Sequence, residues 1–118
     1  MSSVQAGRVG EAAAIEFLHK KGYKVLSKNF RSRFGEIDIV AQFKNVLVFV
    51  EVKTRWSKKF GYPEEAVTPS KVRSIIKTGD YFKLLNLGTP GLMRVDVIAI
   101  EVEGDEVVEI RHIENVTG

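Results

Sequence analysis

The stretch that most constrains the fold is Val46–Arg55, which reads VLVFVEVKTR. Apolar side chains occupy both faces of its first half, which is typical of a central strand covered on both sides. The polarity changes abruptly at Glu51, and Lys53 follows two residues later. The carbon stems of these groups start in a buried environment, where an unpaired charge costs several kcal/mol. The stretch therefore predicts a central strand that ends in ionisable groups requiring partners.

The preceding run, GEIDIVAQF, predicts an antiparallel neighbour joined to this strand by a two-residue turn. Counting outward from that turn places Asp38 opposite Glu51 and Glu36 opposite Lys53. Cβ atoms of directly opposite residues lie roughly 4.5–5.5 Å apart, and the period of two puts Glu36 and Asp38 on one face. A longer turn would shift the register, and a shift of one residue would reverse the faces.

Two carboxylates at that separation repel each other unless one is protonated or a cation lies between them. Asp38, Glu51 and the backbone carbonyl of Val52 would offer oxygen ligands, which favour Mg²⁺ or Mn²⁺ over a softer ion. Lys53 could then orient an attacking water or stabilise developing charge. A plain ion pair of Lys53 with Glu51 or Glu36 at the end of a sheet explains the same residues, and both readings stay open.

The composition predicts one ordinary globular domain over residues 1–118, since 44% of the residues are hydrophobic and 28% are charged. No cysteine is present, which excludes disulfides and cysteine-ligated zinc or iron–sulfur sites. The N-terminal residues lack the pattern of a signal peptide, and no apolar run approaches the ~20 residues of a membrane span. We therefore expect a cytoplasmic protein without a membrane partner.

The charge distribution suggests a polyanionic partner more than the net charge of +3 does. Lysine and arginine dominate residues 19–33, 53–59 and 71–83, whereas acids gather over residues 101–114. This asymmetry favours one basic side that could meet nucleic acid. A solvated surface without such a ligand is the alternative.

Apolar periodicity and turn signals predict two helices and five strands. The helices are expected over residues 5–21 and from the N-cap Thr68 to residue 87, and the strands over residues 23–30 (at a sheet edge), 36–42, 46–54, 92–102 and 106–113, with a loop over residues 56–67. The order αβββαββ favours an α/β fold in which helices flank a mixed central sheet.

Several single residues needed separate interpretation. Glu11 shares a helical stripe with Ile15 and Leu18, yet the residues alone favour an exposed glutamate. Asp96 is an unexpected acid within an apolar strand. His19 and His112 are interpreted as ordinary surface or edge residues.

Four cations are expected near the acidic end of the hairpin, where they could bind backbone phosphates. They are Arg31, Arg33, Arg55 and Lys71. Each alone is typical of a solvated surface charge, so only the cluster is informative. Trp56 and Tyr62 could stack on bases or pack locally.

Four segments, which cover nearly the whole chain, carry a resemblance to a known family. They are GRVGEAAAIEFLHKKGYKVLSKNFRSRFGEIDIVA, LVFVEVKTR, FGYPEEAVTPSKVRSIIKTGDYF and RVDVIAI. The chain resembles the YraN-like family of small bacterial proteins. That family in turn resembles the PD-(D/E)XK (restriction-endonuclease-like) nuclease superfamily, especially archaeal Holliday-junction resolvases. The resemblance implies an αβββαβ core, to which this chain adds one C-terminal strand.

The resemblance also implies roles for individual residues. Asp38 matches the metal-binding aspartate of the motif, and Glu51 and Lys53 match its E-x-K pair. Glu11 matches the acid of the first helix, which replaces its interpretation as a surface residue and makes it a further candidate metal ligand. Ile37 stands where the motif often has a proline.

The implied activity is Mg²⁺- or Mn²⁺-dependent endonucleolytic hydrolysis of structured or branched DNA, with RNA as the other nucleic acid to consider. A homodimer and a partner helicase or nuclease are compatible with it. The first alternative is a non-catalytic nucleic-acid-binding module that retains the nuclease fold. The second is a structural domain whose acidic hairpin is an ion-paired end of the sheet.

Overall fold

The computed structural model describes residues 3–56 and 61–117. Its elements follow the predicted order with one addition, the short 3₁₀ helix η2 in the segment predicted as a loop. In chain order they are α1 (Ser3–Lys20), β1 (Lys24–Ser32), β2 (Gly35–Phe43), β3 (Val46–Arg55), η2 (Pro63–Ala66), α2 (Pro69–Leu85), β4 (Leu92–Glu103) and β5 (Glu106–Ile113). Residues 57–60 of the predicted loop, with Lys58 and Lys59, lie outside the described residues.

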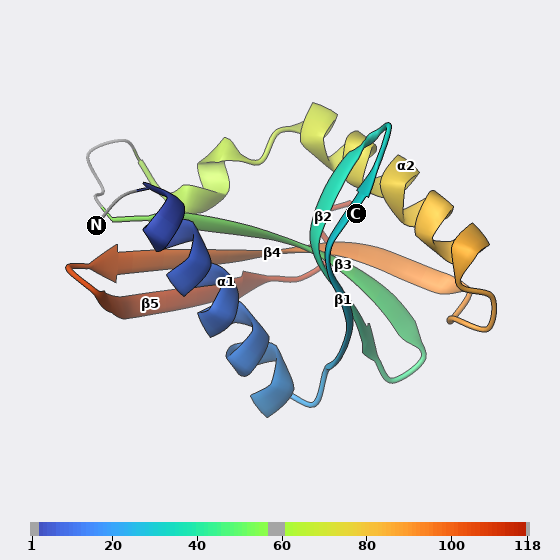
Figure 1. The fold of residues 1–118 in the computed structure, drawn as a ribbon, viewed down its shortest axis with the longest axis horizontal. Helices are drawn as coiled ribbons and strands as arrows, with labels where there is room; N and C mark the ends of the chain where they lie inside the picture. The colour runs from blue at the N-terminus through green and yellow to red at the C-terminus, as the bar shows by residue number, and fades with distance from the viewer. Residues whose placement is uncertain (1–2, 57–60, 118) are drawn as a thin grey trace.

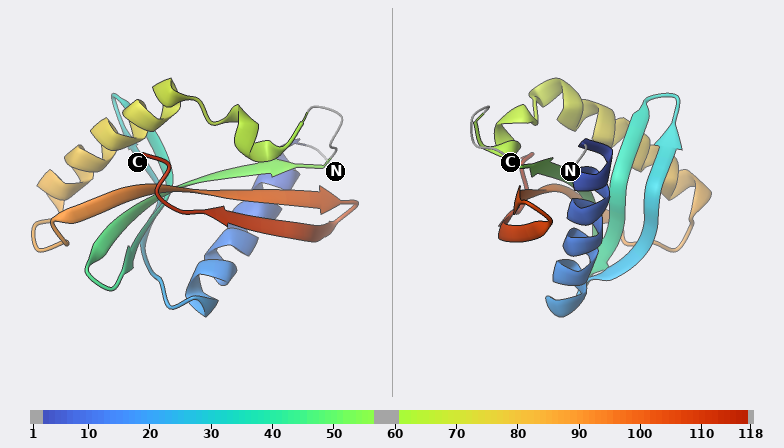
Figure 2. Two further views of the ribbon diagram at one scale, coloured as in Figure 1. Left: turned by 180° about the vertical axis from the view of Figure 1, so that it is seen from behind. Right: turned by 60° about the vertical axis from the view of Figure 1, so that its left-hand side comes forward.

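The strands form one five-stranded sheet in the order β1-β2-β3-β4-β5. The pair β3–β4 is parallel and the other neighbours are antiparallel, so the sheet is mixed. The helices α1 and α2 lie on opposite faces of it (Figures 1 and 2). The αβββαβ core with one added C-terminal strand, and the edge position of β1, are confirmed.

Strand β3 is the centre of the core, as its apolar run predicted. Residues 47–50 are fully buried and alternate between two apolar clusters, one on each side of the sheet. Val48 and Val50 pack in the cluster of α1, whereas Leu47 and Phe49 pack in the cluster of α2. Burial on both faces explains why this strand carries no polar alternation until Glu51.

The most buried residues of α1 are mostly its small ones rather than its large apolar ones. The residues of α1 with the least exposure are Ala6, Gly10, Ala14 and Leu18, while Val9, Ala13 and Phe17 are only partly buried. Small residues face the sheet because they allow the helix axis to approach the strands closely.

Helix α2 begins as the sequence predicts. The Thr68 side chain accepts a hydrogen bond from the Lys71 N–H at 3.2 Å, and Pro69 is the first helical residue. The helix ends at Leu85, two residues before the predicted end, and Asn86 is its C-cap. Gly79 allows α2 to pack closely on β3, because a Cβ there would overlap the ring of Phe49.

The Gly79→Ala substitution is expected to lower the free energy of unfolding by about 1–3 kcal/mol, because overpacking forces the neighbouring ring to move. Urea denaturation followed by circular dichroism measures this change. Gly7→Ala in α1 is the matched control, since a Cβ there would meet no atom within 4 Å. The control should gain about 0.5–1 kcal/mol from helix propensity. Equal effects of the two substitutions would contradict the close packing.

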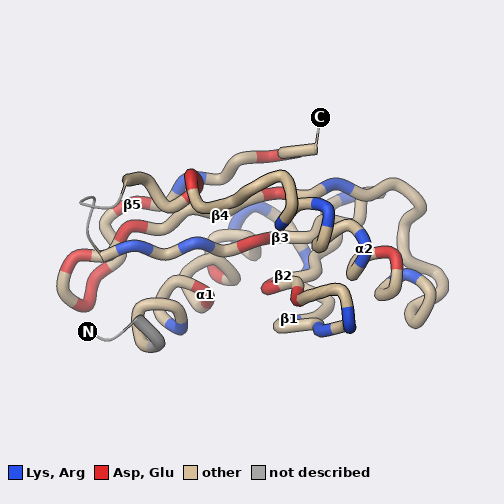
Figure 3. Tube along the Cα trace, turned by 90° about the horizontal axis from the view of Figure 1, so that it is seen from above, with Lys and Arg blue, Asp and Glu red and all other residues tan. Residues whose placement is uncertain are grey.

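Charges are distributed unevenly over the fold (Figure 3). Acidic residues gather at the β4–β5 turn, whereas lysine and arginine residues lie at the β1–β2 turn and along α2. Among the described residues, no helix is long and apolar enough to cross a membrane.

Candidate metal centre

The β2–β3 hairpin has the predicted register over its paired length. Phe43 pairs with Val46 across the turn, and the pairing continues to Ile39 and Val50. The two-residue turn adopts a left-handed conformation at Lys44, whose φ is 53°. Asp38, just before Ile39, and Glu51, just after Val50, therefore lie immediately beyond the last pair of the two strands.

Beyond Ile39, a hydrogen bond to the Asp38 side chain replaces the backbone hydrogen bonds between β2 and β3. Its Oδ2 atom accepts a hydrogen bond from the Val52 N–H at 2.8 Å. Asn29, its counterpart by register on β1, has a φ of 54°. Ile37 packs in the α2 cluster and Ile39 in the α1 cluster, so the strict alternation behind the predicted common face of Glu36 and Asp38 is interrupted here. The backbone pairing of β2 and β3 is thus interrupted at Asp38, Glu51 and Val52, and we call this place the notch.

Glu51 lies in this notch and is almost completely buried, with 4% of its surface exposed. Its Oε2 atom has no hydrogen-bond partner among the described residues, although Lys71 Nζ of α2 lies 3.4 Å away. Burial, together with the hydrogen bond and the charge of Asp38, raises the pKa of Glu51 to about 8, and the charges of Lys71 and Lys53 offset only part of this rise. Without a cation, Glu51 therefore retains its proton near neutral pH.

Glu11 reaches the notch because α1 packs directly on β3. A Cβ at Gly10 would overlap the Thr54 hydroxyl, so glycine allows this approach. Glu11 and Asp38 line the same cavity of about 460 Å³. Burial raises the pKa of Glu11; a hydrogen bond with Asn29 opposes this shift and the charge of Asp38 adds to it. The exposed-surface interpretation of Glu11 is therefore wrong, since this carboxyl group is half-buried beside a second acid.

Residues at the C-terminal end of β3 also line this cavity. Val52, Lys53 and Arg55 line it from that strand, and Arg8 lines it from α1. The Nε atom of Arg55 is buried and has no hydrogen-bond partner among the described residues. The exposed Trp56 also lines the cavity. Acids, a lysine and arginines thus meet at one end of β3.

The four cations expected to bind phosphate differ in their relation to the cavity. Arg55 lines it, and Lys71 lies beside it through its contact with Glu51. Arg31 pairs with Glu36 on the neighbouring strands, with Nε and Oε2 3.6 Å apart. Arg33 lies at the β1–β2 turn, and its guanidinium carbon is 4.9 Å from the centroid of the Phe34 ring.

The donor set of the notch fits a hard divalent ion. Asp38 and Glu51 place two carboxyl groups together, and within the described part of the chain the buried Oε2 atom of Glu51 has no hydrogen-bond partner. The Val52 carbonyl belongs to the same strand. Glu11 lines the cavity from α1, but the carboxyl oxygens of Glu11, Asp38 and Glu51 do not all lie within 4.8 Å of one another, so Glu11 would have to move to become a third carboxylate ligand. Oxygen donors of this kind suit Mg²⁺ or Mn²⁺.

A second group of potential metal ligands is satisfied by protein groups. One ligand atom from each of Asp96, His112 and Glu114 lies within 4.8 Å of the others. However, Arg94 Nε lies 3.0 Å from Asp96 Oδ1 and Lys21 Nζ lies 2.8 Å from His112 Nδ1. These cations already contact the ligand atoms, so the group is a hydrogen-bond network, buried at Asp96 and exposed at Glu114.

His112 lies on the edge strand β5, as one of its two interpretations predicted, but it is not a surface residue, because only 3% of its side chain is exposed. Its Nε2 atom lies 2.7 Å from Asp96 Oδ2, and the Asn115 N–H donates to Asp96 Oδ1 at 2.9 Å. The chain folds back after β5, so that the Val116 N–H donates to the Val95 carbonyl at 2.8 Å. Burial favours a raised pKa of Asp96, but its hydrogen bonds outweigh burial and lower the pKa. The network holds the end of β5 on β4.

The model of the uncharacterised protein family UPF0102 matches residues 10–100, which include Glu11, Asp38, Glu51 and Lys53 but not Arg8, the arginine that lines the cavity from α1. The chain belongs to the UPF0102 family. The matched range also contains the contact of Gly10 in α1 with Thr54 and the contact of Lys71 in α2 with Glu51.

Relatives in this family are similar over almost their full lengths. The UPF0102 protein of Caldicellulosiruptor saccharolyticus is 43% identical over 98% of this chain and 98% of its own. The UPF0102 protein of Persephonella marina is 46% identical over 80% of this chain and 81% of its own. That of Caldicellulosiruptor bescii is 48% identical over 88% of each.

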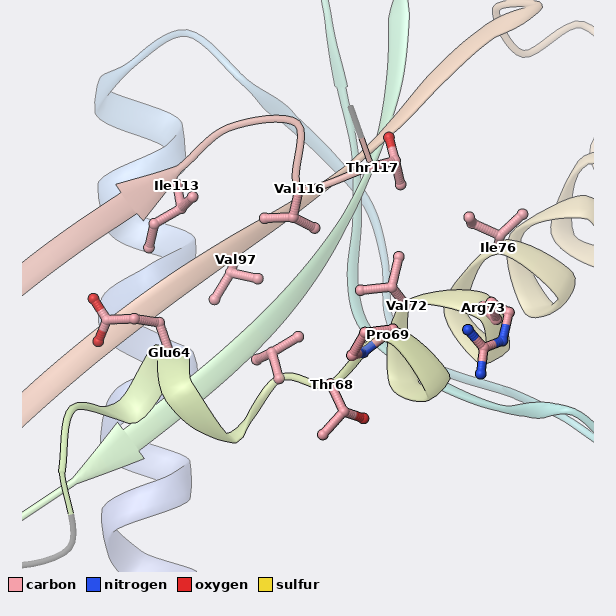
Figure 4. A pocket seen from close by; sticks show the side chains of 11 residues that line it. Glu64, Thr68, Pro69, Val72, Arg73, Ile76, Val97, Ile113, Val116 and Thr117 are labelled. Atoms are coloured by element: carbon pink, nitrogen blue, oxygen red, sulfur yellow. The ribbon is translucent and has the colours of Figure 1, made fainter.

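A separate cavity of about 550 Å³ lies between η2, the start of α2 and the end of β5 (Figure 4). Its wall is largely apolar, with Val97, Ile113 and Val116 on one side and Val72 on the other. The carboxylate of Glu64 is bound by Arg111 at 2.7 Å, which lowers its pKa. Among the described residues that line this cavity of the UPF0102 protein, the one acid is therefore paired, and Arg73 is the other charged residue.

Two residues of the notch were missed by sequence reasoning. Arg8 precedes Glu11 by three residues, so helical spacing could have placed it on the same face. Asn29 carries the left-handed backbone opposite Asp38, and asparagine is among the few residues that tolerate it. Its place in a strand gave no local sign of this role.

Proposed function

We propose that this UPF0102 protein is a divalent-metal-dependent endonuclease that hydrolyses phosphodiester bonds in structured or branched DNA. The observation that carries the proposal is the contact between Asp38 and the buried Glu51, with Lys53 one pleat further along β3. Two adjoining carboxylates next to a lysine suit metal-assisted phosphoryl chemistry better than they suit a stable sheet end.

Asp38 and Glu51 would hold Mg²⁺ or Mn²⁺, together with the Val52 carbonyl, and Glu11 would support it from α1. Bound there, the ion would neutralise phosphate charge and lower the pKa of a water. Asp38 is oriented for this role by the Val52 N–H at 2.8 Å. Lys53 lines the cavity and would orient the attacking water or stabilise charge that develops on the phosphate.

The cations around the notch support a nucleic-acid substrate. Arg8 and Arg55 line the same cavity as the acids, and Lys71 lies at its α2 side. Arginine and lysine side chains can bind backbone phosphates and so position a strand without reading its sequence. The resemblance to junction resolvases favours branched DNA as the substrate.

A cleavage assay tests the proposal. The protein is incubated with linear, flapped, forked and four-way DNA, in Mg²⁺, in Mn²⁺ and in chelator, and the products are resolved on denaturing gels. We expect cutting of branched substrates that requires the metal. The control is the Asp38→Asn protein purified in the same way. DNA binding without metal-dependent cutting would support a non-catalytic binding module instead, and cutting that persists in the control would identify a contaminant.

A further inference from the structure

We propose that the cavity between the β1–β2 turn and α2 binds an unpaired base of a single-stranded DNA segment. Its volume is about 660 Å³, and it is separate from the cavity that contains Asp38. The inference rests on the proposed nuclease function and deepens it, because it assigns single-stranded character to the part of the substrate next to the scissile site.

Two aromatic rings form the walls of this cavity and remain open to solvent. Phe34 of the turn is 40% exposed, and Tyr81 of α2 is 41% exposed. Leu84, which is 73% exposed, extends the apolar wall along α2. Exposed aromatic rings bind bases by stacking regardless of sequence, because every base presents a flat π-face.

Hydrogen bonds to α2 hold the turn in place. The Phe34 N–H donates to Ser32 Oγ at 3.0 Å, and Ser32 Oγ lies 3.1 Å from Thr78 Oγ1 of α2. The Ser74 hydroxyl of α2 donates to the Phe34 carbonyl. The ring of Phe34 is therefore presented by a fixed backbone, so little ordering is required when a ligand binds.

The charge of the cavity complements a phosphate backbone. Arg33 lies over the Phe34 ring at 4.9 Å, and Lys77 lines the cavity from α2. An arginine plane itself accepts a stacked base, and both cations can bind the flanking phosphates. Among the described residues that line the cavity, Asp80 is the one acid. Cations and aromatic rings together favour a nucleic acid over an uncharged partner.

Helix α2 connects this cavity with the notch. Lys71, in its first turn, lies 3.4 Å from Glu51, and Tyr81 follows ten residues later. Ten residues correspond to about 15 Å along a helix axis, or about four stacked nucleotides at roughly 3.4 Å each. A strand held at the notch can therefore place a base on Tyr81, provided that this base is unpaired. Forks, flaps and branch points offer such a base, whereas an intact duplex does not.

Fluorescence anisotropy in EDTA tests the inference independently of cleavage. The probes are a short fluorescein-labelled oligothymidylate and a blunt duplex. Tyr81→Ala and Phe34→Ala should each weaken binding of the single strand about five- to tenfold, as loss of base stacking does, and should leave duplex binding unchanged. The conservative variant Tyr81→Phe should bind the single strand as well as the unsubstituted protein does. Asp80→Asn, which removes a negative charge from the cavity, should bind it more tightly.

Tyr62→Ala is the matched control, because Tyr62 is a similarly exposed tyrosine beside a cation, Arg111, and outside this cavity. Binding of the single strand that is unaffected by Tyr81→Ala, or an equal loss for single strand and duplex, would overturn the inference. A change in the oligomeric state of the Tyr81→Ala protein, measured by sedimentation, would also overturn the inference, because Tyr81 would then belong to an interface between protein chains. Tyr81-dependent binding without any cleavage in metal would instead refute the nuclease activity and leave the base-binding cavity standing.

Discussion

Asp38→Asn is expected to reduce metal-dependent cleavage of branched DNA by at least about a thousandfold, which corresponds to about 4 kcal/mol of transition-state stabilisation. The amide removes the negative charge that would hold the ion, yet its oxygen can still accept the hydrogen bond from the Val52 N–H. The fold should therefore persist, and the loss should come from chemistry. Single-turnover rates on a four-way junction measure it.

The matched control for this substitution is Glu36→Gln. Glu36 is another acid of β2, but its carboxylate pairs with Arg31 on the neighbouring edge strand. We expect its rate to remain close to that of the unsubstituted protein. Lys53→Ala should reduce the rate about a hundredfold or more, as loss of a charge-stabilising group does. Equal rates for Asp38→Asn and Glu36→Gln would contradict the assignment of the notch.

Glu51→Gln is expected to stabilise the metal-free protein increasingly as the pH rises. The pKa of Glu51 is about 8 in the folded state against 4.5 ordinarily, because burial and Asp38 disfavour its charged form. The folded state therefore holds a proton that the unfolded state releases, and folding stability falls as the pH rises from about 4.5 through about 8. At about 1.4 kcal/mol per pKa unit, glutamine should raise the free energy of unfolding by roughly 2–4 kcal/mol near pH 8.5.

Urea denaturation over this pH range, with and without Mn²⁺, measures both parts of the prediction. The ion should stabilise the unsubstituted protein by mass action, and it should stabilise Glu51→Gln much less because a ligand is lost. Near pH 4 the two metal-free proteins should differ little, since the carboxyl group is then protonated in both states. The same pH slope for both proteins would show that Glu51 does not retain its proton.

The fold could be predicted to the extent that local chemistry determines it. The apolar run at residues 47–50 identified the doubly covered strand, and the short turn determined the register from Phe43–Val46 to Ile39–Val50. Thr68 and Pro69 determined the start of α2. In each case the signal comes from neighbouring residues whose conformational preferences agree with the final structure.

What could not be predicted depends on contacts between distant segments. The close approach of α1 to β3 depends on the small residues Gly10 and Ala14, which apolar periodicity does not single out. The burial of His112 follows from Asp96 and from the return of the chain after β5. Neither interaction leaves a periodic signal in the sequence.

The candidate site combines both kinds of information. The proximity of Asp38 and Glu51 follows from the register, and the structure has these two carboxyl groups in contact. The interruption at Asp38 and the approach of Glu11 through Gly10 require the packed fold. Glu11 was predicted as a site residue from the family resemblance, because its position in the helix alone favoured an exposed glutamate.

Anomalous scattering from crystals grown with Mn²⁺ would test the metal centre most directly. The account predicts a peak in the notch, bound by the carboxylates of Asp38 and Glu51, with Lys71 displaced from its present 3.4 Å contact with Glu51. It also predicts that crystals of Asp38→Asn lack this peak. A peak at the Asp96–His112–Glu114 network with none at Asp38, or a peak in the notch that survives Asp38→Asn, would contradict it.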